Sequence, residues 1–97
     1  MSESEENSEG LITLDDTLDI TLAATYFEQL SQLLNQHKTI VINGENIERI
    51  DGAGLQLLAA FFKSAESLHI SVQWQGCSEA LKKSAKLSGL SGSLAIN

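Results

Sequence analysis

The chain has 97 residues, of which 42% are hydrophobic, and a formal net charge of −7. This length suits one domain, because too few residues remain to build a second hydrophobic core. No apolar run approaches the roughly 20 residues that span a bilayer, and the first ten residues lack the basic and apolar pattern of an export signal. The single cysteine excludes an intramolecular disulfide and a cysteine-rich metal cluster. We therefore expect a cytoplasmic protein of one domain.

Acidic residues outnumber basic ones by 13 to 6, which argues against a nucleic-acid-binding surface. Four of the acids lie within the first nine residues: Glu3, Glu5, Glu6 and Glu9. Because this stretch has almost no large apolar group, residues 1–10 are predicted to form a disordered acidic tail. Residues 11–97 are predicted to form the domain. Three lysines near the C-terminus, Lys82, Lys83 and Lys86, are interpreted as a solvated helix face.

The domain is predicted to begin with two strands, residues 11–14 and 17–22. The second alternates, with Leu18, Ile20 and Leu22 on one face. The two-residue break between the strands favours a hairpin, although Asp-Asp is a weaker turn signal than Asn-Gly. The pattern therefore predicts an antiparallel edge to the sheet.

A helix is expected next, over residues 23–35, capped by Thr21 or, with a shorter stripe, by Thr25 with Glu28 three residues on. Its inner stripe has helical spacing and consists of Ala23, Phe27, Leu30 and Leu34, widened by Tyr26 and Leu33. Residues 39–43 are β-branched and apolar almost throughout, which predicts a strand in the middle of the sheet.

The second half of the domain is predicted to contain an apolar helix, a strand and a third helix. The helix covers residues 55–67 and the strand covers residues 70–75. The third helix is capped by Ser78, extends to about Leu87 and ends at Gly89. Leu90, Leu94 and Ile96 are expected to pack back onto the core.

This order, β-β-α-β-α-β-α, predicts a two-layer α/β domain. Strand–helix–strand connections imply parallel neighbouring strands, whereas a hairpin joins two antiparallel strands. The prediction is therefore a mixed sheet of four strands. Three strands carry polar residues on one side, whereas a doubly wound sheet needs apolar residues on both faces. We therefore expect the helices mainly on one face of the sheet.

No catalytic or metal-binding pattern is present. His37 and His69 belong to no matched pattern of metal ligands, and Cys77 has no local histidine motif. Residues 52–54, Gly-Ala-Gly, match neither of two common phosphate-binding motifs. One motif requires Lys-Ser/Thr after the glycines, and the other requires a third glycine. We therefore expect a protein that is not an enzyme and holds no cofactor or metal.

The most distinctive segment is residues 47–58, where a polar loop becomes an apolar helix. Asp51 is placed to cap the helix, and Gly52 and Gly54 flank a small residue, Ala53. The lack of side-chain bulk lets another surface approach the backbone closely. The same residues also suit a tight turn that requires small side chains. Composition alone leaves these two interpretations open.

The chain resembles the STAS domain family (sulfate transporter and anti-sigma factor antagonist). The resemblance is carried by the pattern I-x-x-I-D-x-x-G-L-x-L-L at residues 47–58, by Leu-x-x-Leu-Leu at residues 30–34, and by residues 74–81 and 85–90. The resemblance covers about residues 11–95. Within the family, the chain is most similar to the small stand-alone bacterial members.

The resemblance implies a protein-interaction module that binds a signalling or transport partner, as an anti-sigma factor antagonist does. The family's contact region corresponds here to Asp51, Gly52, Ala53, Gly54 and Gln56. The implied partners are an anti-sigma or serine kinase-like protein, the ATPase of an ABC transporter, or a chemotaxis component. In switching members a phosphorylated Ser or Thr follows the aspartate, whereas this chain has glycine. We therefore expect constitutive binding.

Two alternatives stay open within this resemblance: the STAS subunit of an ABC-type lipid transporter, and a domain that binds a nucleotide or lipid. The start of the second helix suits an anion, but Asp51, Glu48 and the charge of −7 oppose one. Leu57 and Phe61 widen the apolar face of this helix, either as part of the interface or in contact with neighbouring helices. The identity of the partner and the oligomeric state are not predicted.

Overall fold

The computed structural model describes residues 9–96, so the predicted tail at residues 1–8 lies outside the described residues. Gly10, which the sequence assigned to the tail, lies in the first strand. In chain order the elements are β1 (Gly10–Thr13), β2 (Thr17–Leu18), α1 (Ile20–Gln36), β3 (Thr39–Gly44), β4 (Arg49–Ile50), α2 (Gly52–Ser67), β5 (Ser71–Cys77) and α3 (Glu79–Leu87).

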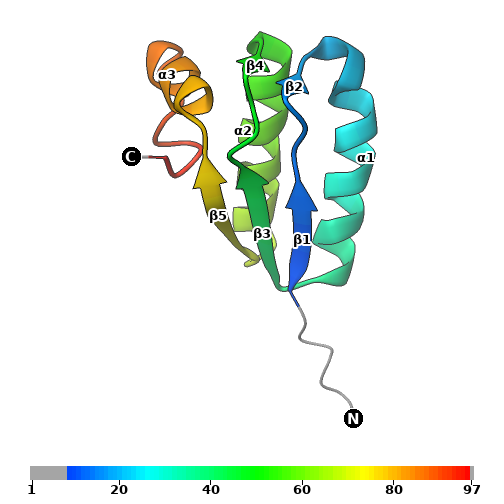
Figure 1. The fold of residues 1–97 in the computed structure, drawn as a ribbon. Coiled ribbons are helices and arrows are strands. Elements are labelled where there is room, and N and C mark those ends of the chain that lie inside the picture. Colours follow the sequence, from blue (N-terminus) through cyan, green and yellow to red (C-terminus); the bar gives the residue numbers. More distant parts are fainter. Residues whose placement is uncertain (1–8, 97) are drawn as a thin grey trace.

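Three of the strands form a parallel sheet in the order β1-β3-β5, with β3 in the centre as predicted. α1 and α2 lie side by side behind this sheet, and α3 follows at the carboxyl end of β5 (Figure 1). The other face carries polar or half-exposed side chains, such as Thr13, Thr39 and Gln73. The structure is therefore the two-layer α/β fold predicted from the sequence, with α1 and α2 on one face of the sheet.

The predicted hairpin is wrong, and with it the mixed four-stranded sheet. β1 pairs with β3 in parallel, from Gly10 opposite Ile40 to Thr13 opposite Asn43. Beyond residue 14 the chain continues in the same direction, and β2 pairs in parallel with β4 as a separate two-stranded ladder. The N–H groups of Glu48 and Arg49 donate to the backbone oxygen of Asp16 and hold this segment beside β4. Every strand pairing in the described part of the chain is parallel.

The second strand ends at Leu18, and α1 begins three residues earlier than predicted. The reason is Asp19, whose side chain accepts from the backbone N–H of Thr21 (3.0 Å) and so acts as the N-cap in place of Thr21. The Thr21 hydroxyl also donates to this carboxylate and holds the pKa of Asp19 below its usual value. Ile20, assigned to the inner face of a strand, is therefore 72% exposed at the helix start.

The buried side of α1 agrees with the predicted inner face except at Phe27. Tyr26 and Leu30 are buried, whereas Phe27 is 59% exposed. The Tyr26 hydroxyl accepts from the backbone N–H of Asp15 (3.0 Å), which fixes the chain between β1 and β2. Burial raises the pKa of this tyrosine.

The second half of the domain agrees more closely with its predicted elements. Ser78 accepts from the backbone N–H of Leu81 (3.0 Å), and Gly89 adopts φ +73° directly after the cap of α3, as predicted. Leu94 and Ile96 are buried in the core, also as predicted, and Leu90 packs against it. The indole N–H of Trp74 donates to the backbone oxygen of Leu94 (2.8 Å) and holds the C-terminal segment against β5.

None of the helices described over residues 9–96 is both long enough and apolar enough to serve as a membrane span.

Candidate partner-binding site

The candidate site is the corner at which β4 ends and α2 begins, and a single carboxylate organises it. Oδ1 of Asp51 accepts from the backbone N–H of Gly54 (2.9 Å) and caps α2 as predicted. Oδ2 of the same side chain accepts from the backbone N–H of Ile20 (3.2 Å), the first residue of α1. Asp51 thus connects the N-termini of the two helices and fixes their relative position.

Replacing Asp51 with alanine is expected to lower the free energy of unfolding by about 1–2 kcal/mol, because two helix N-termini lose a side-chain acceptor. Equilibrium unfolding in urea measures this loss. Asp16→Ala is the matched control, since Asp16 is exposed and forms its hydrogen bonds through its backbone oxygen. Equal unfolding free energies for the two variants would show that the hydrogen bonds of Asp51 to the two helix N-termini contribute nothing to stability.

The two glycines of the corner have opposite environments. A Cβ atom on Gly54 would lie closer to the backbone oxygen of Leu18 than real Cβ contacts do, and 2.9 Å from Cγ1 of Ile50. Gly54 is therefore needed for the close approach of α2 to β2. A Cβ on Gly52 would meet nothing within 4 Å, and this residue is exposed. Of the two, Gly52 is the one that presents open backbone to another molecule.

The remaining predicted contact residues divide in the same way. Gln56 is exposed one turn into α2, and Ala53 is half-buried. Asp51 is exposed, although both of its oxygens accept hydrogen bonds from the chain itself. The outer surface of the corner is therefore formed by Asp51, Gly52 and Gln56, with part of Ala53.

Sequence reasoning missed Ile20, which is bound to this corner through Asp51 and is 72% exposed. An isoleucine directly after a capping aspartate is a helix-start signal that the alternating pattern concealed. A small groove of about 50 Å³ lies between α1 and α2, lined by Phe27, Leu57, Ala60 and other uncharged residues of the two helices.

The two residues that widen the apolar face of α2 behave differently. Phe61 is buried among its neighbours, with 4% exposed. Leu57 is half-buried and lines the groove at the seam between the helices. Both residues line this groove, but Leu57 is partly exposed there, whereas Phe61 belongs to the core.

The described residues contain no group of three or more His, Cys, Asp or Glu side chains placed to hold a metal ion. Cys77 is half-buried at the end of β5, and burial raises the pKa of its thiol, with Lys82 partly opposing the shift. A raised pKa leaves less thiolate at neutral pH, the opposite of what a nucleophilic cysteine requires.

The chain matches the model of the family described as Mlab, STAS domain, over residues 1–96. It therefore belongs to the STAS domain family. A comparison with curated proteins gave no match.

Two solved structures show the same fold. One is the anti-sigma factor antagonist SpoIIAA in its unphosphorylated form, which is 21% identical, with a TM-score of 0.74 over 93% of this chain and 80% of SpoIIAA. The other is a sulfate transporter family protein from Wolinella succinogenes, which is 17% identical, with a TM-score of 0.76 over 89% of this chain and 70% of that protein.

Proposed function

We propose that this chain is a non-enzymatic interaction module that binds a protein partner through the outer surface of the corner at residues 51–56. The observation that carries the proposal is the open space around Gly52, which lies one turn before the exposed Gln56 and next to Asp51, whose side chain holds the N–H of the exposed Ile20. An exposed glycine lets the backbone of a partner come close, and the exposed isoleucine supplies apolar contact area. The proposed partner is a signalling protein, as for an anti-sigma factor antagonist.

Binding is proposed to be constitutive. Gly52 follows Asp51 at the position where switching family members carry a phosphorylated Ser or Thr, and residues 45–60 contain no Ser, Thr or Tyr. Regulation is then expected through the abundance or state of the partner. Loss of partner binding after phosphorylation of the chain by candidate kinases, at any residue, would contradict this model.

A small-ligand function is less well supported by the same geometry. An anionic ligand at the start of α2 would have to displace the Asp51 carboxylate from the N–H of Gly54. The second candidate function is that of the STAS subunit of an ABC-type lipid transporter, which would use the same corner to bind the ATPase of the transporter. The proposed location of the domain is the cytoplasm in either case.

Affinity capture from an extract of the source organism tests the proposal. The immobilised chain is expected to retain one polypeptide in near-stoichiometric amount. Gln56→Arg is expected to reduce this retention at least tenfold, which is about the effect of substituting a residue that is buried in an interface. Gln73→Arg makes the same chemical change on the open face of the sheet and should retain the partner fully.

Loss of the partner in both glutamine variants would indicate a non-specific effect of the added charge. Loss in Gln73→Arg alone would place the interface on the open face of the sheet and contradict the proposal. Native mass spectrometry of the captured complex separates the candidates, because an ATPase and a kinase-like signalling protein differ in mass and sequence.

A further inference from the structure

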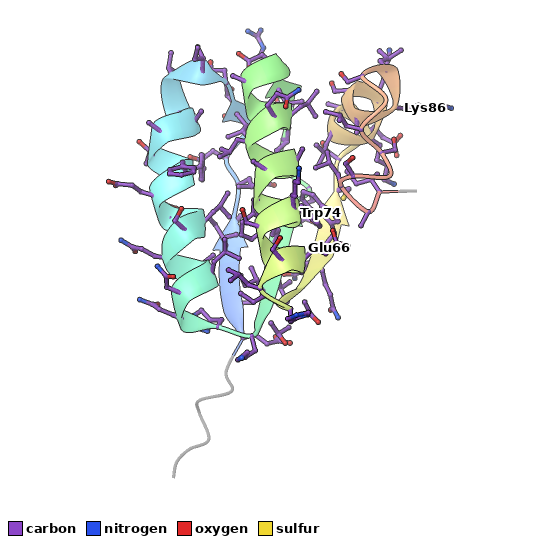
Figure 2. All side chains as sticks on the ribbon, turned by 180° about the vertical axis from the view of Figure 1, so that it is seen from behind. Glu66, Trp74 and Lys86 are labelled. Carbon is purple, nitrogen blue, oxygen red and sulfur yellow. The ribbon has the colours of Figure 1, made fainter. Side chains whose placement is uncertain are left out.

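The surface of α1 and α2 that points away from the sheet carries few charges. In Figure 2 the two helices lie side by side in front of the sheet, and Asp51 joins their N-termini, so they run in the same direction. Glu28 is the single charged residue of α1, and α2 contains two, Lys63 and Glu66. Charged residues are depleted in the core of protein interfaces, so this surface has the composition of an interface.

The middle of this surface is the groove of about 50 Å³ between α1 and α2. Phe27 lines the groove from α1 and is 59% exposed, and the small residues Ala60 and Ser64 line it from α2. Ile20 lies two helical turns before Phe27, hence on the same side of α1, and is 72% exposed. These four residues define the outer helix face. Large exposed apolar groups beside small side chains suit close packing against another layer of helices.

Two opposite charges lie on either side of the groove. Glu28 directly follows Phe27 on α1, and Lys63 lies on the side of α2 that is remote from α1, where it lines the hollow beside the C-terminal segment. Both side chains are exposed, and neither forms an ion pair within residues 9–96. The outer helix face is therefore an uncharged strip with an acidic border and a basic border.

Such a face is self-complementary about a twofold axis that runs along the groove. This axis exchanges the two sides of the groove and keeps the direction of the helices, so α1 of each copy lies over α2 of the other. Glu28 of one copy then faces Lys63 of the other. An axis across the helices would instead place α1 over α1, with Glu28 on the same side as Glu28 of the second copy.

The height of the two charges along the helices is compatible with this pairing. Residues 27–34 of α1 and residues 57–64 of α2 line the same groove, so positions about 30 apart lie at the same height. A twofold axis along the groove leaves heights unchanged. Glu28 and Lys63 therefore differ by about five residues, or roughly 7–8 Å along the axis, which a glutamate and a lysine side chain together span.

We propose that a second copy of the chain covers the outer helix face, in a twofold dimer whose axis runs along the groove between α1 and α2. Phe27 lies next to this axis, so the two Phe27 rings meet there beside Ala60 and Ser64 of the other copy. The helices have 17 and 16 residues, so two stacked pairs, each about 24 Å long and about 20 Å wide, cover roughly 1,000 Å² in total. That area reaches the lower limit for a specific interface, which suits a dimer that exchanges with the monomer.

The dimer does not rest on the proposed function, because it concerns the purified chain alone. Ile20 belongs both to the outer helix face and to the corner at the start of α2. The dimer and the complex with a partner are therefore expected to exclude each other.

Charge exchange between the copies tests the dimer. Glu28→Lys and Lys63→Glu each place two pairs of like charges across the axis, and each is expected to weaken the dimer at least about tenfold. An equimolar mixture of the two variants restores two pairs of opposite charges. The mixture is therefore expected to form the mixed dimer.

Glu45→Lys and Lys86→Glu are the matched controls, because they make the same changes at exposed positions outside the outer helix face. Figure 2 shows Lys86 on α3, pointing away from α1 and α2. Each control is expected to alter the dimer affinity less than about threefold. Controls that weaken the dimer as much as the test variants would reduce the effect to net charge and overturn the proposed pairing.

Sedimentation velocity over a range of concentrations gives the dimer affinity. Native mass spectrometry distinguishes the mixed dimer by its mass when one of the two variants is labelled with ¹⁵N. A wild-type chain that stays monomeric up to about 1 mM would overturn the proposal. So would single variants that dimerise as the wild type does, or a mixture that forms no mixed dimer.

Discussion

Replacing Gly54 with alanine is expected to lower the free energy of unfolding by about 2–3 kcal/mol. The added methyl group would meet the backbone oxygen of Leu18 and the side chain of Ile50. A backbone atom cannot move aside by a rotamer change, so α2 would have to shift away from β2. The gain in helix propensity from glycine to alanine, about 1 kcal/mol, offsets only part of this loss. Equilibrium unfolding in urea measures the difference.

Gly52→Ala is the matched control, because it makes the same change two residues earlier in the same helix. A methyl group there meets nothing within 4 Å. The variant is expected to be as stable as the wild type or more stable by up to about 1 kcal/mol. If Gly54→Ala were as stable as Gly52→Ala, the close approach of α2 to β2 would not constrain this position.

Replacing Gly52 with glutamate is expected to reduce partner affinity about a hundredfold or more while leaving the domain folded. The fold is retained because the residue is exposed and an acidic side chain is favourable in the first turn of a helix. Binding is lost because a solvated charge and three added side-chain carbons occupy the space into which the partner backbone must come. Titration of the captured partner against the purified variant measures the change.

Gly92→Glu provides the matched control for this experiment. Gly92 is also exposed, and a Cβ there also meets nothing within 4 Å. Both variants replace a glycine with a glutamate, so their net charge is the same and only the position of the glutamate differs. If both variants bound the partner as the wild type does, the outer surface of the corner could not be the interface.

The elements that could be predicted from the sequence are those marked by a strong local pattern, such as a run of β-branched residues or a capping side chain. The central strand follows from a run of β-branched residues in 39–43, and the start of α3 follows from the capping side chain of Ser78. The hairpin failed because β2 and β4 have two residues each, too short for a periodic pattern, and their pairing joins positions about 32 residues apart, as in Thr17 opposite Arg49.

Phe27 was wrongly assigned to the buried face of α1 for a related reason. Tyr26 and Phe27 are adjacent and both apolar, so either can head a stripe of helical spacing. The choice depends on where the helix starts and on the hydrogen bond between the Tyr26 hydroxyl and the N–H of Asp15. Neither is visible in the local pattern, because tertiary contacts decide both.

The candidate site shows the same limit at the level of single residues. The sequence predicted the cap at Asp51 and a corner of small residues, and it treated Gly52 and Gly54 as equivalent. Only the position of β2 distinguishes them, because the oxygen of Leu18 lies beside one glycine and open space beside the other. The contribution of Ile20 was hidden until the end of β2 at Leu18 was known.

The central claim, that a partner binds the exposed corner at the start of α2, is tested most directly by NMR on the complex. The backbone amide signals of isotope-labelled chain are followed as the captured partner is added. We expect the largest shifts or losses at Gly52, Ala53 and Gln56, with Ile20 beside them. Changes confined to the open face of the sheet, around Val41 and Gln73, with the corner signals unaltered, would contradict the account.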